Sequence, residues 1–444
     1  MRLLKTVLQE SPADQTEAIL MTEDSSLTRF AQSSVHQHVA EKNQTVILRT
    51  VIGKKIAVLS TNILDPRTLK DTLHKAVSLA RLQRPNQEFV SLPGPQPIPA
   101  VDTFSRNIED LTPAKKVRFI KEILKLAGED GLRASGAFSH GVVELAVANS
   151  LGVEAYQRYS DMFFHLIAQN GDNSGYAGFV SRDPHLFDAQ AIAREARDKV
   201  SGRDPVAVEP GEYEVVLEPY AVRELLVFLA YLGFHALAIQ EGRSFFCNQI
   251  GKKLADEKVT IFDDGLDPRG LQIPFDFEGQ PKQRIFFFEN GVARGVTYDS
   301  FAAGKERKVS TGHALLPPNT EGPIPLNLIM KGGDSSLKEM VRSVRRGIYV
   351  TRFHYTNVVE PMKAVITGMT RDGTFLIENG EIKNPVKNLR FTESILKALS
   401  RVKAISKERK ICSEGTVYSR RFITGTLVPA IQVDGFYFSG VSTL

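Results

Sequence analysis

The amino-acid sequence predicts an α+β protein of two domains: an N-terminal mixed α/β domain with an antiparallel sheet, and a C-terminal β-rich domain with one long helix. The chain has 444 residues, and a domain usually contains about 100–200 residues. Helical and strand-like patterns alternate up to residue 200, whereas short strands and turns dominate beyond residue 242. Pro205 and Pro210 bound a polar stretch at 201–210. We therefore expect domains at 1–205 and 206–444.

Hydrophobic spacing and turn residues predict the elements of the N-terminal domain. Strand-like composition and the turn residues Gly53-Lys54 indicate a strand at 15–22 and a hairpin within 45–60. Amphipathic spacing with an early proline predicts helices at 66–83 and 113–127. Four prolines at 89–103 indicate a surface connection. Further strands are expected at 133–138, 142–148 and 152–169, with a turn at 148–152 and a helix at 186–200.

The C-terminal domain shows one long helical pattern and two hairpin signals. A strand at 213–217 is followed by a helix predicted over 219–239, which begins with Pro219. Asn-Gly pairs at 290–291 and 379–380 stand between apolar runs, and this dipeptide is the strongest short-range hairpin signal. We expect hairpins in related positions of a β-rich domain.

Composition excludes several classes of protein. The net charge is +5 (56 basic minus 51 acidic residues), and no block of like charges or basic stripe with interleaved aromatics is present, so no nucleic-acid role is expected. Cys247 and Cys412 are too few for a disulfide framework or a four-cysteine metal site. No apolar run reaches the 18–20 residues that span a bilayer, and the N-terminus does not resemble a signal peptide. We expect a cytoplasmic protein with no membrane role.

The residues alone give no strong catalytic motif. None of the nine histidines is followed by glutamate, so an HExxH metalloprotease helix is excluded. His36 and His38 share one face of a probable strand, and the favoured interpretation is that they face solvent. His235, Glu241 and Cys412 are weak metal-ligand candidates, since their spacing is poor. Five acids within 16 residues lack the EF-hand pattern and predict a solvated polar turn: Asp263, Asp264, Asp267, Asp276 and Glu278.

An ordered set of segments carries a family resemblance. In the C-terminal half these are GEYEVVLEPYAVRELLVFL (211–229), EGRSFF (241–246), GKKLADEKVTIFDDG (251–265), PFDFEGQPKQRIFFFENGVARGVTYDSFAAGK (274–305), STGHAL (310–315), GGDSSLKEM (332–340), RGIYV (346–350), FLIENGEI (375–382) and PAIQVDGFYFSG (429–440). Weaker echoes are ADQTEA (13–18), SSVHQ (33–37) and NSLG (149–152). With this order and spacing, essentially the whole chain resembles the TldD/TldE metallopeptidase family, whose TldE members are also called PmbA.

The resemblance implies a cytoplasmic metallopeptidase system. The active TldD type carries HExxxH in the long helix and a cysteine near the C-terminus, which together would hold zinc and a water activated by the glutamate. The TldE type lacks this motif and pairs with TldD, so that a peptide lies in a cleft between the two chains. Both statements are implied by the resemblance and not by composition or spacing.

The sequence departs from the active pattern at the zinc motif. The window before Glu241-Gly242 that should hold HExxxH reads GFHALA (233–238), with glycine and alanine at the two ligand positions and Phe234 at the base position. His235 is out of register, whereas Cys412 falls roughly where the active type has its cysteine ligand. We therefore expect a TldE/PmbA-like chain with no catalytic residue and no metal of its own, zinc being on a TldD-type partner.

Three functions stay open at this stage. The first is a non-catalytic subunit that forms one wall of a cleft for extended or unfolded peptides, with Arg243 and Ser244 as candidate substrate-binding residues. The second is a self-sufficient metallopeptidase with an unusual metal site built from His235, Glu241, Cys412 and His313. The third is a homodimeric peptide-binding scaffold without a protease partner.

Overall fold

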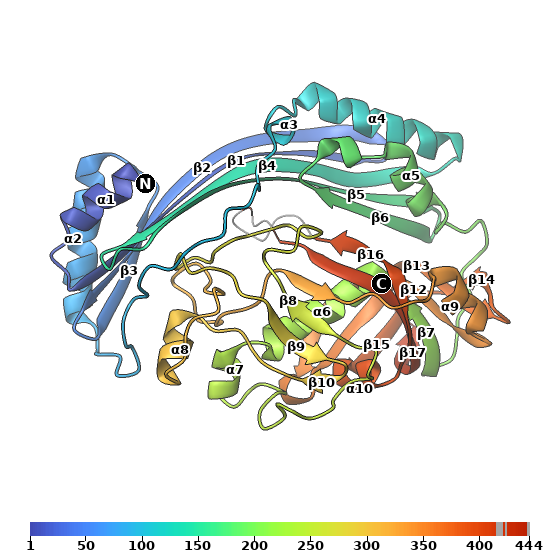
Figure 1. Cartoon of the computed structure of the whole chain (residues 1–444). Coiled ribbons are helices and arrows are strands. Elements are labelled where there is room, and N and C mark those ends of the chain that lie inside the picture. Colours follow the sequence, from blue (N-terminus) through green and yellow to red (C-terminus); the bar gives the residue numbers. More distant parts are fainter. Residues whose placement is uncertain (414–420, 422–423, 442–444) are drawn as a thin grey trace.

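Two β-sheets form the framework of the protein. The structure is a computed structural model that describes residues 1–413, 421 and 424–441. A long six-stranded sheet arches over a second sheet of eleven strands, and helices flank both (Figure 1). This arrangement confirms the predicted α+β fold class. The predicted boundary near residue 205 lies in the connection between the last helix of the N-terminal half and the first strand of the second sheet.

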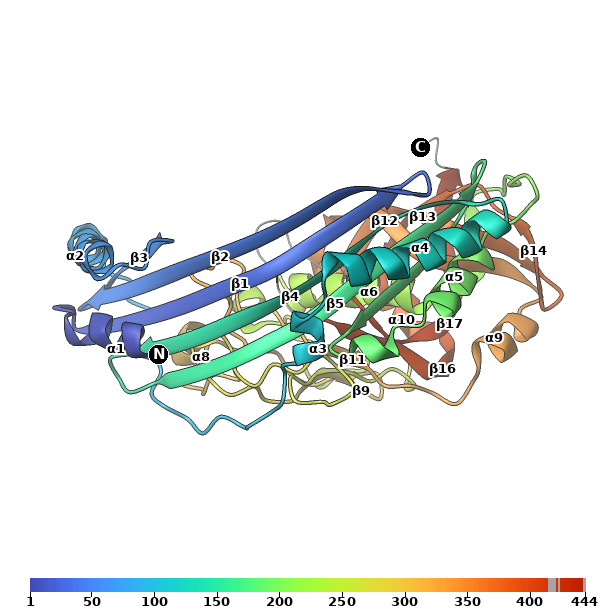
Figure 2. The same cartoon turned by 90° about the horizontal axis from the view of Figure 1, so that it is seen from above.

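The first sheet is antiparallel throughout, with strand order β3-β2-β1-β4-β5-β6. Its strands run side by side along the length of the molecule (Figure 2). They are β1 (Gln15–Ala31), β2 (Ser34–Ile52), β3 (Lys55–Thr61), β4 (Arg133–Asn149), β5 (Glu154–Asn170) and β6 (Asn173–Ser181). The hairpin predicted at Gly53 is confirmed, and so is the turn at 148–152. The strands expected at 133–138 and 142–148 are one strand, because β4 pairs with β1 without interruption.

Alternating residues give this sheet two different faces. Ile19, Met21 and Val143 point to the inner face, where they pack against the segment around Phe275 of the C-terminal half. On the opposite, outer face, Ala18 and its neighbours pack against the helices α1 (Arg2–Gln9) and α2 (Pro66–Leu82) at one end of the sheet. The helices α3 (Arg106–Glu109), α4 (Pro113–Glu129), η1 (Pro184–Leu186) and α5 (Ala189–Arg197) cover its other end (Figure 1). The middle of the outer face lies between these two groups.

The second sheet has the order β10-β9-β8-β11-β17-β15-β13-β12-β7, and β14 and β16 pair with β13 and β17. Its strands are β7 (Gly211–Leu217), β8 (Ile261–Asp263), β9 (Ile285–Glu289), β10 (Val292–Ala293), β11 (Leu328–Met330), β12 (Arg346–Glu360), β13 (Val365–Glu378), β14 (Glu381–Pro385), β15 (Leu389–Ser394), β16 (Val402–Cys412) and β17 (Thr426–Val441). Because β7 pairs with both β12 and β17, five of these strands form a closed ring. The associated helices are α6 (Pro219–Gly233), α7 (Ala236–Gln240), α8 (Ser300–Lys305), α9 (Leu337–Ser343), η2 (Pro361–Lys363) and α10 (Ile395–Ser400).

The single helix predicted over 219–239 is interrupted in the structure. Helix α6 ends at Gly233, and α7 begins at Ala236 after an extended His235. The cause is a strand-like exchange with Thr297, in which Ala236 N donates to Thr297 O at 2.9 Å and Thr297 N donates to Phe234 O at 3.0 Å. These bonds replace helical ones, and His235 Nδ1 caps α7 by accepting from Ala238 N at 3.4 Å.

The two Asn-Gly hairpins are confirmed. Asn290 and Gly291 have φ angles of 49° and 78°, and Asn379 and Gly380 have φ angles of 50° and 78°. Positive φ at both central residues is the geometry that tight antiparallel hairpins require. The first pair joins β9 to β10 and the second joins β13 to β14.

Candidate functional site

The window predicted to correspond to the zinc motif lies inside an aromatic cluster. Phe234 has no exposed surface, and its ring stacks on Phe287 with centroids 4.1 Å apart and an interplanar angle of 2°. Phe245, Phe246 and Phe288 surround this pair with centroid distances to Phe234 of 5.8, 5.5 and 5.9 Å. The position that would hold the general base is therefore filled by close-packed rings.

The two ligand positions of this window leave no room for a metal site. A Cβ atom at Gly233 would lie 2.5 Å from the Phe245 ring, so no histidine fits there unless that ring moves. Ala238, at the second position, is fully buried. The sequence of α6 contains no histidine or cysteine. These residues do not fit a zinc ion.

The structure does not bring the weak metal candidates together. The His235 ring bonds Tyr231 O and Ala238 N, while Glu241 pairs with Arg243 at 2.6 Å and is 47% exposed. His313 lies against Asp263, with Nε2 and Oδ1 3.0 Å apart. Across residues 1–413, 421 and 424–441, no three His, Cys, Asp or Glu side chains are arranged to hold a metal ion.

Cys412 is a buried thiol at the end of β16. Burial raises the pKa of this thiol to about 12, although Lys410 and Arg223 oppose the shift. Its Sγ lies 3.9 Å from Lys410 O, a weak thiol–carbonyl contact. Since the thiolate is the form that binds metal, the protonated Cys412 is a poor ligand in this environment.

The two residues predicted to bind substrate occupy different environments. Arg243 reaches the surface, where its guanidinium bonds Glu241 and lies 3.5 Å from Glu321 O. Ser244 is fully buried; its hydroxyl donates to Gly233 O at 3.0 Å and accepts from Phe246 N at 2.9 Å. Ser244 thus fixes the turn beneath the aromatic cluster. Substrate binding by Arg243 stays a prediction, and contact through Ser244 would require this turn to move.

The uncovered middle of the outer face forms a groove of about 1010 Å³. We call it the outer groove; its lining comes from β1, β2 and β4, with contributions from α3, the start of α4 and β5. Polar and charged side chains of the outer face, such as Thr22, Ser26 and Lys42, contribute to its lining. Next to the groove, only residues 46–52 of β2 pair with β3. In the described part of the chain, no strand pairs with residues 34–45 of β2 on the side away from β1. Such an edge presents backbone donors and acceptors to an added strand.

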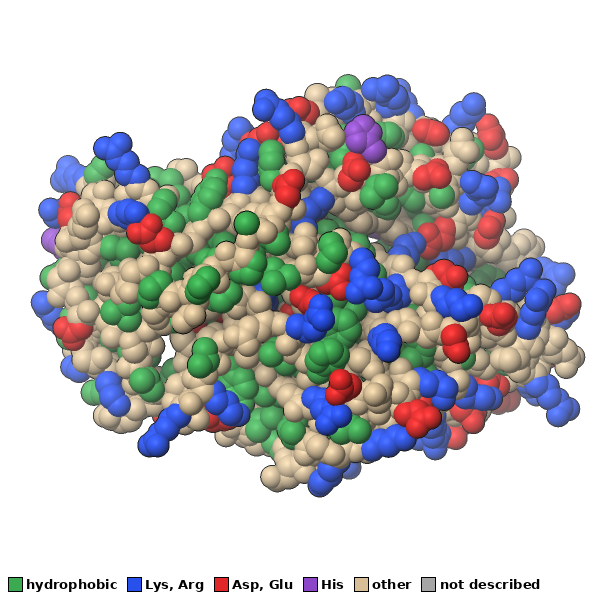
Figure 3. Space-filling view, viewed as in Figure 1, with side chains coloured by type: hydrophobic (Ala, Val, Ile, Leu, Met, Phe, Trp, Pro, Cys, Tyr) green, Lys and Arg blue, Asp and Glu red, His purple; other side chains and the backbone are tan. Residues whose placement is uncertain are grey.

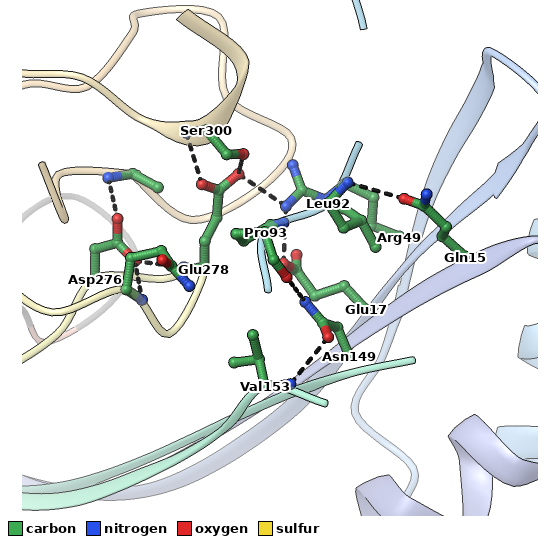
Figure 4. Close-up of polar contacts among 12 residues, drawn as sticks. Gln15, Glu17, Arg49, Leu92, Pro93, Asn149, Val153, Asp276, Glu278 and Ser300 are labelled. Carbon is green, nitrogen blue, oxygen red and sulfur yellow. Dashed lines mark hydrogen bonds and ion pairs between the residues drawn. The ribbon is translucent and has the colours of Figure 1, made fainter. Parts of the chain in front are cut away.

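A buried polar cluster joins the first sheet to the C-terminal half (Figure 4). Arg49 on β2 bridges Glu17 on β1 and Glu278, with Nη2–Oε distances of 2.8 and 2.9 Å. Glu278 also accepts from the backbone and hydroxyl of Ser300, at 2.9 and 2.7 Å. Asp276 accepts from the backbone nitrogens of Glu278, Gln280 and Ala314. One arginine therefore faces several carboxylates between the two layers.

The solvated turn predicted for the acidic segment is wrong. Asp263, Asp264, Asp267, Asp276 and Glu278 are all buried, each with at most 6% of its surface exposed. Backbone N–H groups and neighbouring cations hold them instead: Asp263 accepts from Asn327 N at 2.6 Å, and Asp264 pairs with Arg284 at 2.6 Å. Sequence proximity alone cannot distinguish a solvated turn from an acidic segment packed under a sheet.

Burial controls the protonation of this cluster. Desolvation raises the pKa of Glu17 to about 7 against the attraction of Arg49, and it raises the pKa of Asp276 to about 8. The pKa of the nearby Asp299 is raised to about 6 for the same reason. The pKa of Arg49 is also raised, but for an arginine this shift favours the charged form. Burial lowers the pKa of Arg49, and the attraction of Glu17 and Glu278 outweighs burial. The pKa shifts of Glu17 and Arg49 are compatible. Arg49 is attracted by two carboxylates, whereas Glu17 has to share the single arginine with Glu278.

Two family models match the sequence of this chain, and both describe domains of metallopeptidase-related proteins. The PmbA/TldA metallopeptidase C-terminal domain matches residues 210–440, and the central domain of the same proteins matches residues 106–203. Because the first match alone covers more than half of the chain, the chain belongs to the PmbA/TldD metallopeptidase family. The family resemblance inferred from the sequence is confirmed.

Several relatives of this chain are named as metalloproteases. A metalloprotease TldD homolog of Buchnera aphidicola is 32% identical over 39% of this chain and 36% of its own length. An uncharacterised protein of Methanocaldococcus jannaschii is 30% identical over 53% of this chain and 57% of its own length. A metalloprotease of Methanothermobacter thermautotrophicus is 24% identical over 69% and 70% of the two chains. The match thus spans only about a third to two-thirds of the length of these relatives.

Solved structures share the fold over nearly the whole chain. TldE from Thermococcus kodakarensis superposes with a TM-score of 0.89 at 20% identity and covers 99% of both chains. A putative modulator of a DNA gyrase from Thermotoga maritima superposes with a TM-score of 0.83 at 19% identity over 96% of both chains. At these identities the likeness establishes the fold and not the function.

Proposed function

We propose that this chain is a TldE/PmbA-like, non-catalytic subunit of a TldD/TldE-type peptidase that degrades extended or unfolded peptides. The observation that carries the proposal is the closed aromatic cluster around Phe234, in a member of a metallopeptidase family. Zinc and the general base are supplied by a TldD-type partner, and this chain forms one wall of the peptide cleft. The cytoplasmic location expected from the sequence is part of this proposal.

The outer groove and the unpaired edge of β2 support a peptide-holding role. An extended peptide bonds an exposed strand through its main chain, so the edge at residues 34–45 accepts many sequences. The volume of the groove, about 1010 Å³, leaves space for peptide side chains of different sizes. The face seen in Figure 3 carries mixed acidic and basic side chains, which gives no preference for nucleic acid.

Metal content and partner dependence test this proposal directly. The chain purified alone without chelators should contain no stoichiometric zinc by mass spectrometry, and it should cleave unfolded casein only when mixed with a relative that carries HExxxH. Cys412→Ala should leave this partner-dependent cleavage nearly unchanged. One zinc per chain that disappears in Cys412→Ala would overturn the proposal and favour a self-sufficient metallopeptidase.

Main-chain recognition has a separate test. A labelled extended peptide is compared with its analogue with N-methylated alternate amides, which lacks those backbone donors, and with an analogue methylated at the intervening amides, which controls for the added methyl groups. Fluorescence anisotropy should show tighter binding of the unmodified peptide, by about tenfold if two hydrogen bonds are lost. Equal affinity of all three peptides would exclude strand addition as the mode of binding.

A further inference from the structure

Lys116 of α4 is a buried cation without an acidic partner in the described part of the chain. Its side chain has no exposed surface, and Nζ donates to Ser26 Oγ at 2.7 Å. Burial and the charge of Arg421 lower the pKa of Lys116 to about 8, and no carboxylate opposes this shift. Arg421 itself is neutralised by Asp161, with two contacts of 2.8 Å. A buried ammonium without a counter-ion destabilises a protein, so stability does not explain the presence of Lys116.

The strand register places polar groups beside Lys116 at one end of the outer groove. Ser26 lies opposite His140 on β4, and Thr28 lies opposite His38 on β2. Ser26 Oγ is 3.3 Å from His140 Nδ1, and Thr28 Oγ1 is 2.8 Å from His38 Nδ1. Ser26 Oγ accepts from Lys116, and in the tautomer in which His140 Nδ1–H also donates to Ser26 Oγ, the hydroxyl hydrogen of Ser26 is left to donate to a ligand. Ser26, His38 and His140 line the groove, with Lys116 behind them.

The acidic groups of the groove are already paired elsewhere. Asp24 pairs with Lys42 at 2.9 Å, and Arg158 pairs with Glu144 at 3.3 Å and also with Glu109. The Glu23 side chain points to the inner face of the sheet, as Met21 does, and its carboxylate accepts from the backbone nitrogen of Arg421 at 3.1 Å. Glu109 and Glu144 thus share the single Arg158. Glu144 lies four residues along β4 from His140, and among the described residues Lys116 has no carboxylate partner at the α4 end of the groove.

We infer that this end of the outer groove binds a carboxylate group of a peptide, with Ser26 as the direct donor and Lys116 as the charge behind it. The inference rests on the proposed peptide-holding function and names the chemical group that the groove recognises. A single ammonium matches a singly charged carboxylate better than a doubly charged phosphate. A neutral His38 adds an uncharged N–H donor, because burial and Lys116 lower its pKa. Burial and Lys116 also lower the pKa of His140, and the single N–H of that neutral ring donates to Ser26 Oγ.

Labelled peptides that differ only at the C-terminus test the inference. Anisotropy titrations compare a hexapeptide with a free C-terminal carboxylate, its C-terminal amide, and an amide ending in glutamate. The wild-type chain should bind the free acid about tenfold tighter than the plain amide, the usual scale for a charge-assisted bond. Equal affinity of the glutamate amide and the free acid supports a side-chain carboxylate as ligand, whereas weak binding of the glutamate amide supports the chain terminus.

Two variants assign the effect to Lys116. Lys116→Met keeps the volume of the side chain and removes the charge, and it should abolish the preference for the acid. Lys121→Met removes an exposed lysine of the same helix and should retain the preference. An unchanged preference in Lys116→Met would overturn the inference, and so would equal wild-type affinity for all three peptides.

Thermal unfolding in sodium acetate separates this inference from the proposed function. If no peptide binds, but acetate raises the melting temperature of the wild type more than that of Lys116→Met, the carboxylate site stands and the peptide-holding function fails. If neither peptides nor acetate distinguish the two proteins, the carboxylate site itself is refuted. Phosphate stabilises proteins in general, so the relevant quantity is the difference between the wild type and Lys116→Met. A larger difference in inorganic phosphate than in acetate would also refute a site for a singly charged ligand.

Discussion

Replacing Glu17 by glutamine should stabilise the protein at pH 8 and destabilise it at pH 4, where only the cost of the unpartnered amide remains, about 1–2 kcal/mol. Glu17 has no exposed surface, its Oε2 shares Arg49 with Glu278, and its Oε1 has no hydrogen-bond partner. Burial raises its pKa from 4.5 to about 7. The folded state thus holds the Glu17 proton more tightly than the unfolded state, and the stability from this proton is lost as the pH rises from about 4.5 to 7.

The pKa shift sets the size of the effect. A shift of about 2.5 pKa units corresponds to about 3 kcal/mol of unfolding free energy at 1.36 kcal/mol per unit. Glutamine avoids this penalty, but its buried amide hydrogens lack partners, which costs about 1–2 kcal/mol. We therefore expect Glu17→Gln to gain about 1–2 kcal/mol at pH 8. Glu278 keeps Arg49 paired in the variant.

Urea unfolding followed by circular dichroism at pH 4 and pH 8 measures the effect. Glu41→Gln removes an exposed carboxylate of the same sheet, and it should shift the urea midpoint at neither pH. A lower midpoint for Glu17→Gln than for the wild type at pH 8 would refute the reasoning. A gain of equal size at both pH values would also refute it, because ionisation of Glu17 could not then be the cause.

Three further outcomes follow from the same contacts. Arg49→Met should destabilise the protein by about 3–5 kcal/mol at pH 8 and by less at pH 5, where Glu17 takes up a proton; urea midpoints at both pH values check this. Gly291→Val should lower the melting temperature, because φ is 78° and a Cβ atom would lie 2.3 Å from Ala255 O; an unchanged melting temperature would contradict the close approach. Phe234→Ala should lower the unfolding free energy by about 3–5 kcal/mol without adding a zinc site, which denaturation and metal analysis measure together; a loss below about 1 kcal/mol would mean that the aromatic cluster is not close-packed.

Local sequence signals predicted most single elements of the fold. Proline at the start and amphipathic spacing with one apolar face located α2 and α4, and the capping bonds of Asp65 and Thr112 complete these helix starts. Asn-Gly pairs located two hairpins because the required positive φ angles are a property of those residues themselves. The long helix was predicted too long, since its interruption depends on Thr297, which lies 62 residues after His235.

The sequence by itself determined the fold class, the family and the apolar character of the zinc window, because each depends on residue type and order along the chain. Only the tertiary structure decided which charges lie together. Arg49 contacts Glu17 and Glu278, which lie 32 and 229 residues away in the sequence. Lys116 contacts Ser26, which lies 90 residues away. Such contacts depend on strand register and on the packing of one layer against another, and no local spacing encodes either. For this reason the acidic segment was predicted to be solvated although it is buried, and the end of the outer groove at Lys116 had no signal in the sequence.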